Sequence, residues 1–343
     1  MKKGILYSSI FIVIFIVTFI VTIWLIKKPN IIPQNVYEVY GNRLSKKSSY
    51  NNPIVPEGFK KIETDTASWE LENGIPKGWN SGLVIEDEIG NQFVWVPISD
   101  KEDLDLSKYS VMGDVVDGPG KNESEKEFLQ NENYEGFYIS RYEAGLPEEI
   151  QKNIKEYNAE TNNVTGIPVS KKEQIVWNFI DWNQAKKNAQ LMYKDKKIKS
   201  DLVTRQQWDR ISYWLYEDNL EIEMKKAKDY GNCYDVEFDF TGYYSTDYGK
   251  TYQYAKNKNK EIGNMLLSTG ATERNKTKNI YDLSGNVCEF RDEDKSIYND
   301  KISKDYDTVG GHYAKNSEYS IRNTNGISLA RSNQGFRIVL YLE

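Results

Sequence analysis

An almost unbroken apolar run without charge, over residues 4–26, constrains this chain more than any other feature of its sequence. A helix rises 1.5 Å per residue and needs about 20 apolar residues to cross the ~30 Å hydrocarbon core of a membrane, so the run is long enough. A cleaved signal peptide has a shorter apolar region that ends in small residues, whereas this run ends in Trp, Leu, Ile and two lysines. The sequence predicts an uncleaved N-terminal membrane anchor, residues 1–28, with one transmembrane helix.

Charge bears on orientation and on partners. Two lysines precede the apolar run and two follow it, so the positive-inside rule gives no direction. The very short leading segment and the acidic remainder, with a formal net charge of -6, favour a single-pass protein of the cell membrane with its domain outside, at the cell surface. The net negative charge argues against binding of nucleic acid, because a surface that binds nucleic acid requires clustered Lys and Arg. The expected partners are the membrane and an unknown protein or glycan ligand.

The rest of the chain divides into a linker and one domain. Residues 29–60 are rich in Pro, Asn, Ser and Lys and show no periodicity, which is typical of a linker. Residues 61–343 form the expected domain, with a loop insertion near 101–133 that is acidic and contains glycine. The chain has 25 Tyr, 12 Phe and 8 Trp, and these large side chains can form a compact core despite the polar composition.

Local patterns predict a few regular elements. Alternating apolar residues indicate strands over 92–98 and 136–143, and the chain closes with another strand over 336–340. Asp181 with Gln184, and Thr204 with Gln207, have the spacing of an N-cap and its return contact, so each pair should begin a helix. Beyond residue 216 the sequence suggests short aromatic segments broken by Gly, Asn and Asp.

Two cysteines, Cys233 and Cys288, are the whole thiol supply. They could form one disulfide outside the membrane, or remain two separate buried thiols. The sequence leaves both alternatives open.

Five segments, in order, resemble the formylglycine-generating, sulfatase-modifying family. Residues 137–143 (FYISRYE) are similar to its early strand, the helix after Asp181 to its Trp-plus-Ala helix, and residues 202–208 (LVTRQQW) to its "RLPTEAEW" element. Residues 279–290 (NIYDLSGNVCEF) match its "GLYDMxGNVWEW" signature, and two glycines at 310–311 followed by Gly-Phe-Arg at 335–337 match its "GGS…GFR". The resemblance covers roughly residues 90 to 343 and implies an α+β, C-type-lectin-like fold with little regular secondary structure.

The family's chemistry is not expected in this chain. The resemblance implies a copper-binding cysteine pair between the glycine pair and the closing Gly-Phe-Arg, yet residues 311–335 contain no cysteine. Soft Cu(I) requires thiolates, and an iron site requires at least two histidines where this chain has one, His312. We therefore expect neither copper nor iron and assign no catalytic residue.

Calcium is the cofactor that the resemblance allows. In the family the signature loop binds Ca²⁺ through side chains that match Asp282 and Glu289 and through carbonyls that match Gly285 and Val287. Two carboxylates and two carbonyls suit this hard ion. An extended strand of seven residues spans about 23 Å, so the loop must curl to bring the two acids together. Alternatively, the two acids cap a turn and pair with a neighbouring cation.

A scaffold that lacks its catalytic residues suggests a non-catalytic recognition module. The loop after residue 311 is polar and aromatic, as binding loops on rigid scaffolds often are. Its candidate ligand-binding residues are Tyr313, Lys315, Asn316, Tyr319 and Asn323. The alternatives are a divergent formylglycine-generating oxidase with relocated thiols and a structural component of an envelope assembly.

Overall fold

The computed structural model describes residues 49–98, 135–193, 198–216, 230–292, 297–298, 301–302, 306–316, 325–327 and 329–342. The predicted anchor, the linker up to residue 48 and the predicted insertion near 101–133 lie outside these residues. No helix within the described ranges combines the length and the apolar character that crossing a membrane requires. The predicted transmembrane helix has no counterpart within the described residues.

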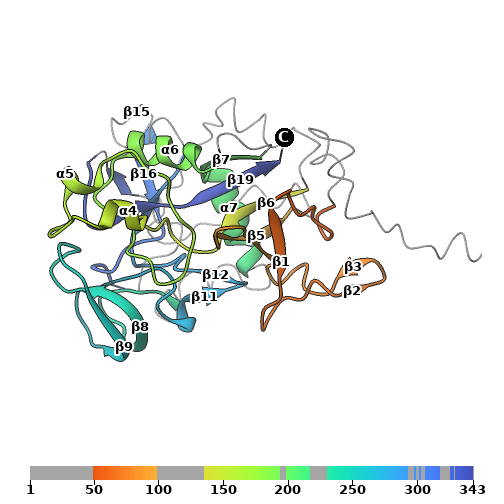
Figure 1. Cartoon of the computed structure of the whole chain (residues 1–343), viewed down its shortest axis with the longest axis horizontal. Coiled ribbons are helices and arrows are strands. Elements are labelled where there is room, and N and C mark those ends of the chain that lie inside the picture. The colour runs from red at the N-terminus through yellow and green to blue at the C-terminus, as the bar shows by residue number, and fades with distance from the viewer. Residues whose placement is uncertain are drawn as a thin grey trace, which may run out of the picture.

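Strands dominate the described residues, and this corrects the α+β class expected from the sequence (Figure 1). The largest sheet has the order β1-β4-β5-β6-β19-β7, and each neighbouring pair in it is antiparallel. Its strands are β1 (Phe59–Ile62), β4 (Val84–Asp87), β5 (Gln92–Pro97), β6 (Gly136–Ser140), β7 (Ile198–Leu202) and β19 (Ile338–Leu342). The correction has a physical reason: after residue 230, frequent Gly, Asn and Asp residues divide the chain into segments too short for stable helices.

The sheet separates two hydrophobic clusters because successive side chains of a strand point to opposite faces. Phe93 of β5 packs in the cluster that contains Ala185 of helix α6 (Trp182–Leu191). The next residue, Val94, packs in the cluster that contains Trp208 of helix α7 (Arg205–Tyr216). The predicted strand over 92–98 is thus confirmed as a central strand buried on both faces.

Local caps determine where the two longer helices begin. The hydroxyl of Thr204 accepts from the N–H of Gln207 at 3.2 Å, and the Gln207 side chain accepts from the N–H of Thr204 at 2.9 Å, so the predicted reciprocal cap is confirmed. At α6, Asp181 accepts from the N–H of Gln184 at 2.9 Å, but Gln184 makes no return contact. Asn163 supplies it by accepting from the N–H of Asp181 at 3.1 Å.

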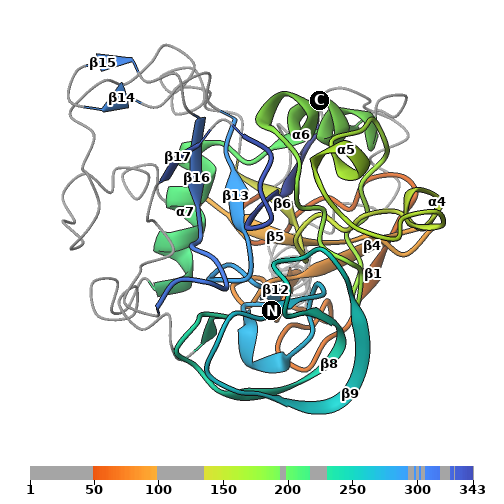
Figure 2. The ribbon, with the colours of Figure 1, turned by 90° about the vertical axis from the view of Figure 1, so that its left-hand side faces the viewer.

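The remaining elements lie outside the large sheet, and apart from β8 and β9 they are short. The helices are α4 (Glu148–Gln151), α5 (Ala159–Asn162) and the 3-10 turn η4 (Glu273–Asn275). Paired strands are β2 (Leu71–Glu72) with β3 (Ile75–Pro76), β11 (Lys276–Thr277) with β12 (Ile280–Tyr281), and β14 (Ile297–Tyr298) with β15 (Lys301–Ile302). The strands β8 (Phe238–Ser245) and β9 (Gln253–Lys260) form a hairpin, and β10 (Leu266–Leu267) pairs with β8 on its other side. This hairpin lies at the lower edge of the molecule in Figures 1 and 2.

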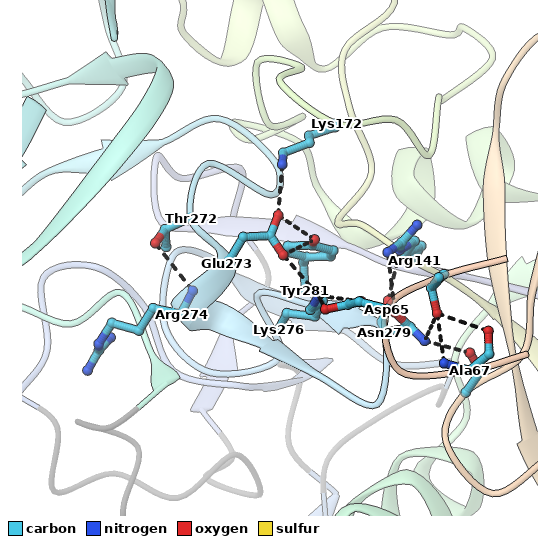
Figure 3. A network of polar contacts seen from close by, with 12 residues as sticks. Asp65, Ala67, Arg141, Lys172, Thr272, Glu273, Arg274, Lys276, Asn279 and Tyr281 are labelled. Atoms are coloured by element: carbon cyan, nitrogen blue, oxygen red, sulfur yellow. Dashed lines mark hydrogen bonds and ion pairs between the residues drawn. The ribbon is translucent and has the colours of Figure 1, made fainter. Parts of the chain in front are cut away.

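The packed domain begins before residue 61, the start expected from the sequence. The indole N–H of Trp95 donates to the carbonyl of Tyr50 at 2.7 Å, and the hydroxyl of Tyr138 donates to the carbonyl of Ile54 at 2.9 Å. Farther along, Asp65 accepts from the ammonium of Lys276 at 3.0 Å (Figure 3). These contacts hold the segment before β1 and the segment after it against the body.

A buried ammonium holds the base of the β8–β9 hairpin. Lys260, the last residue of β9, is fully buried, and its Nζ donates to the carbonyls of Cys233, Val236 and Glu261 at 2.9, 2.8 and 3.4 Å. These three bonds use all three donors of the ammonium. Burial lowers the pKa of Lys260 to about 8.

A four-stranded sheet, β17-β16-β13-β18, brings together two of the five segments that carry the family resemblance, the signature and the closing glycine motif. Its strands are β13 (Cys288–Phe290), β16 (Tyr306–Val309), β17 (Asn325–Ile327) and β18 (Gln334–Phe336). Strand β13 of the signature pairs in parallel with β18, which leads into the closing Gly-Phe-Arg. The predicted last strand is interrupted at Arg337, between β18 and β19.

Candidate ligand-binding site

The signature loop curls, as its sequence predicts. Asp282, Gly285 and Asn286 have φ values of 57°, 76° and 55°, all in the left-handed region. A Cβ on Gly285 would lie 2.2 Å from the carbonyl oxygen of Asn232, so this position has room for glycine alone. The curl thereby brings the loop against the segment around residue 232.

Asn286 is the centre of a buried polar network below the curl. Its Nδ2 donates to Glu143 Oε2 at 2.6 Å and to the Leu267 carbonyl at 3.1 Å. Its Oδ1 accepts from Leu267 N at 3.0 Å and from Asn232 Nδ2 at 2.9 Å. One amide thus connects the early strand segment, the β10 strand and the 232 segment.

Glu289 forms a fully buried ion pair with Arg337, at 2.7 Å from Oε1 to Nε. The guanidinium also donates to the carbonyls of Ser140, Tyr281 and Asp282. The second oxygen of Glu289, Oε2, is buried and has no hydrogen-bond partner among the described residues. The closing Gly-Phe-Arg is therefore joined to the signature loop by charge as well as by strand pairing.

Three buried carboxyl groups surround this single guanidinium. Burial raises the pKa of Glu289 to about 7, although the nearby Arg337 opposes the rise. Burial, reinforced by the negative charges of Asp282 and Glu289, raises the pKa of Glu143 well above its usual range. Burial also raises the pKa of Asp282. The cluster therefore favours uptake of a proton.

The two acids predicted to bind calcium differ in their surroundings. Asp282 accepts from Gly270 N at 2.7 Å and from Asn275 Nδ2 at 3.1 Å, so it caps turns, as the alternative interpretation proposes. The unpartnered Oε2 of Glu289 fits a cation ligand. The described ranges contain no group of three or more His, Cys, Asp or Glu side chains placed to hold a metal. Calcium held by the side chains of Asp282 and Glu289 and the carbonyls of Gly285 and Val287 stays a prediction.

The predicted ligand loop contributes two residues to a surface pocket. Lys315 and Asn316 line a cavity of about 430 Å³ together with Tyr234, Asn264 and Ala314; we call it the Tyr234 pocket. This volume falls within the range of roughly 300–1,000 Å³ typical of small-molecule sites. Tyr319 and Asn323 lie outside the described residues.

Tyr313 does not face a ligand from this loop. Its side chain is 1% exposed and packs with Val176, Leu266 and Val287. Its hydroxyl lies 3.2 Å from the hydroxyl of Ser332, and its N–H donates to the Asn286 carbonyl at 3.0 Å. Tyr313 anchors the loop from inside, which corrects its expected role as a contact residue.

Backbone hydrogen bonds connect the segments that line the Tyr234 pocket. The N–H of Tyr234 donates to the carbonyl of Lys315 at 2.7 Å, and its own carbonyl accepts from the N–H of Gly263 at 2.8 Å. The side chains of Tyr234, Lys315 and Asn264 are therefore displayed from a connected frame. A site on such a frame requires little ordering when a ligand binds.

The two thiols and the histidine are not among the residues that line the pocket. Cys233 and Cys288 are both buried and form no disulfide, which settles the two alternatives in favour of separate thiols. Burial, with the charge of Asp235, raises the pKa of the Cys233 thiol to about 12. His312 is 9% exposed, and burial lowers its pKa to about 4. Its Nδ1 accepts from Ala314 N at 3.2 Å, so it acts as a turn acceptor.

A second polar cluster, on η4 and β12, is internally paired (Figure 3). The Glu273 carboxylate accepts from the ammonium groups of Lys172 and Lys276 and from the hydroxyl of Tyr281, at 2.8–3.0 Å. Partial burial would raise the pKa of Glu273, but these donors outweigh it and lower the pKa to about 2. The cluster is a structural contact between loops.

Several residues of the candidate site were not predicted. Glu143 and Arg337 lie in segments that the resemblance identifies, but no spacing in the sequence indicates that they meet. Tyr234 and Asn264 belong to the stretch 232–264, which does not align residue by residue with the family. The sequence of this stretch offered one signal for a binding site, the frequent aromatic and amide residues between positions 232 and 264.

Comparisons with known proteins add little to this description. No protein-family model matches the chain, and no curated protein sequence matches it. The structure is similar to that of CarF, at 15% identity and a TM-score of 0.37, covering 61% of this chain and 87% of CarF. It is also similar to PvdO from Pseudomonas aeruginosa, at 14% identity and a TM-score of 0.42, covering 76% of this chain and 98% of PvdO. At these TM-scores the likeness carries no argument about family or function.

Proposed function

We propose that the chain is a non-catalytic recognition module, on a scaffold that resembles the formylglycine-generating enzymes, and that it binds its ligand in the Tyr234 pocket. The observation that carries the proposal is the pocket itself, which joins Lys315 and Asn316 of the predicted loop to Tyr234 and Asn264 of another segment. Its frame is connected by backbone hydrogen bonds, as expected of a preformed binding site.

The chemistry of the lining supports binding rather than catalysis. The five lining residues include no cysteine, serine, histidine or carboxylate, the groups that most often act as nucleophile or general base. The interval 311–335, where the resembling enzymes carry their copper-binding cysteines, has none. The Cys233 thiol, with its pKa raised to about 12, is a poor source of thiolate.

We expect the purified chain to bind a small polar probe without converting it. The probes are a set of disaccharides, a set of tetrapeptides and a set of nucleotides, followed by ligand-observed NMR and calorimetry. Replacing both Lys315 and Asn316 by Ala removes two of the five lining side chains. We expect the double variant to weaken binding at least tenfold, about 1.4 kcal/mol.

The matched control is Lys256→Ala with Asn259→Ala, the same two residue types on the exposed strand β9. This control should bind like the unchanged chain. The proposal fails if no probe set binds, or if the control weakens binding equally. It also fails if a bound probe is chemically changed, or if a cysteine peptide given with copper yields the formylglycine aldehyde.

We also propose that Ca²⁺ stabilises the domain through the side chains of Asp282 and Glu289 and the carbonyls of Gly285 and Val287. Support comes from the buried, unpartnered Oε2 of Glu289 beside two other carboxyl groups. A ligand at 100 times its Kd stabilises the folded state by about 2.7 kcal/mol, so Tm should be higher in Ca²⁺ than in chelator. Glu289→Gln should remove most of this difference, whereas Glu273→Gln, at a side chain that is 59% exposed, should keep it. Equal melting in both media, with no bound calcium by elemental analysis, rejects the site.

A further inference from the structure

Two exposed tyrosine rings border the Tyr234 pocket. Tyr234, in its lining, is 45% exposed, and Tyr248 is 54% exposed. The hydroxyl of Tyr248 lies 3.3 Å from Nδ2 of Asn264, which also lines the pocket. An aromatic ring offers a flat apolar face together with a polar hydroxyl, which suits ligands that are apolar on one side and polar around the rim.

The polar groups of the pocket are mainly neutral amides. Asn264 and Asn316 each offer two N–H donors and one carbonyl acceptor. The Oδ1 of Asn264 is buried without a hydrogen-bond partner in the part of the chain that the structure describes. A hydroxyl group is likewise donor and acceptor, so it can pair with either end of such an amide.

Other ligand classes fit this lining less well. A phosphate or sulfate group is usually held by several cationic groups or by a helix N-terminus, whereas the lining has one cation, Lys315. A peptide that adds a strand needs an open strand edge, but none of the five lining residues belongs to a strand. An apolar ligand would leave both amides without partners.

We propose that the Tyr234 pocket binds a saccharide, with the C–H face of a sugar ring on Tyr234 and its hydroxyls on the amides of Asn264 and Asn316. This inference rests on the proposed recognition function and specifies its ligand. Lys315 would add a preference for sugars that carry a carboxylate over neutral ones. The bound sugar would keep its glycosidic bonds, because the lining contains no carboxylate pair for their hydrolysis.

The test uses the whole chain in detergent and a glycan array that includes neutral, N-acetylated and uronic-acid sugars, with calorimetry on the best disaccharide. We expect Tyr234→Ala to raise the Kd for that disaccharide at least tenfold, because the variant removes the tyrosine ring. The backbone hydrogen bonds of residue 234 to Lys315 and Gly263 remain in the variant. Tyr234→Phe should bind within threefold, because it keeps the ring. Tyr254→Ala, at a ring that is 54% exposed on β9 and outside the lining, should bind unchanged.

The outcomes separate this inference from the function on which it rests. If tetrapeptides or nucleotides bind in the pocket and no glycan does, the saccharide assignment is overturned and recognition stands. If no probe of any class binds, both are overturned. If a glycan binds but Tyr234→Ala and Tyr254→Ala weaken it equally, the pocket is not its site. Unchanged far-ultraviolet circular dichroism and Tm in each variant establish that the fold is intact.

Discussion

Replacing Arg337 by Met is expected to destabilise the domain by about 3–5 kcal/mol, because it leaves the Glu289 carboxylate buried without its cation. Arg337 is fully buried and also donates to three backbone carbonyls, of Ser140, Tyr281 and Asp282. These acceptors would lose their donors in the variant, which adds to the cost. The free energy of unfolding in urea, measured at a constant pH above 7 so that Glu289 is ionised in the folded chain, gives the value.

Arg331→Met is the matched control, since Arg331 is exposed and its change should stay within about 0.5 kcal/mol. The effect of Arg337 should also depend on Glu289. In a Glu289→Gln background the same Arg337→Met change should cost clearly less, and a double-mutant cycle measures the difference. A loss below 1 kcal/mol for Arg337→Met alone would contradict a stabilising role for this ion pair.

The domain is expected to lose stability as the pH rises from about 4.5 to about 7. The folded state holds the pKa of Glu289 at about 7, above its ordinary value of 4.5, because the carboxyl is buried. In that pH range the unfolded chain ionises this group while the folded chain still keeps its proton, so folding becomes less favourable as the pH rises. Burial also raises the pKa values of Glu143 and Asp282, and these two groups act in the same direction. Each pKa unit corresponds to about 1.4 kcal/mol.

His312 opposes this trend over part of the range. Burial and the charge of Lys315 lower the pKa of His312 from 6.5 to about 4. The contribution of His312 to the stability of the folded state is therefore present above pH 6.5 and is lost as the pH falls toward 4. Urea unfolding of a His312→Asn variant at a series of pH values therefore measures the pH dependence that comes from the buried carboxyl groups, without that of the histidine. Adding Glu289→Gln to that variant should flatten the pH profile. A profile that rises between pH 5 and 7 in the His312→Asn variant would refute the assignment.

Features encoded by neighbouring residues could be predicted from the sequence. The reciprocal cap of Thr204 and Gln207 and the curl at Gly285 and Asn286 depend on side chains within a few positions of each other. The strand over 92–97 follows from its own short run of aromatic and β-branched residues. The expected α+β class was wrong because it came from the family resemblance, whereas the many short strands pair with partners that lie far along the chain.

The candidate site could be predicted only in part because its contacts are set by tertiary packing. Arg337 meets Ser140 across 197 positions, and no local pattern encodes that distance. Tyr313 and Lys315 lie two positions apart in one loop, yet the first is buried and the second lines the pocket. A loop has no fixed periodicity, so its sequence does not indicate which side chains turn inward.

The ammonium of Lys260 occupies a buried position where other proteins could place a bound cation, and here the cation is part of a side chain. It neutralises a cluster of carbonyl dipoles at the base of the β8–β9 hairpin, beside the segment that carries Tyr234. Because the charge is covalently attached, no chelator can remove it and dilution cannot lower its local concentration. The charge at the hairpin base, beside the wall of the pocket, is therefore independent of the supply of free cations.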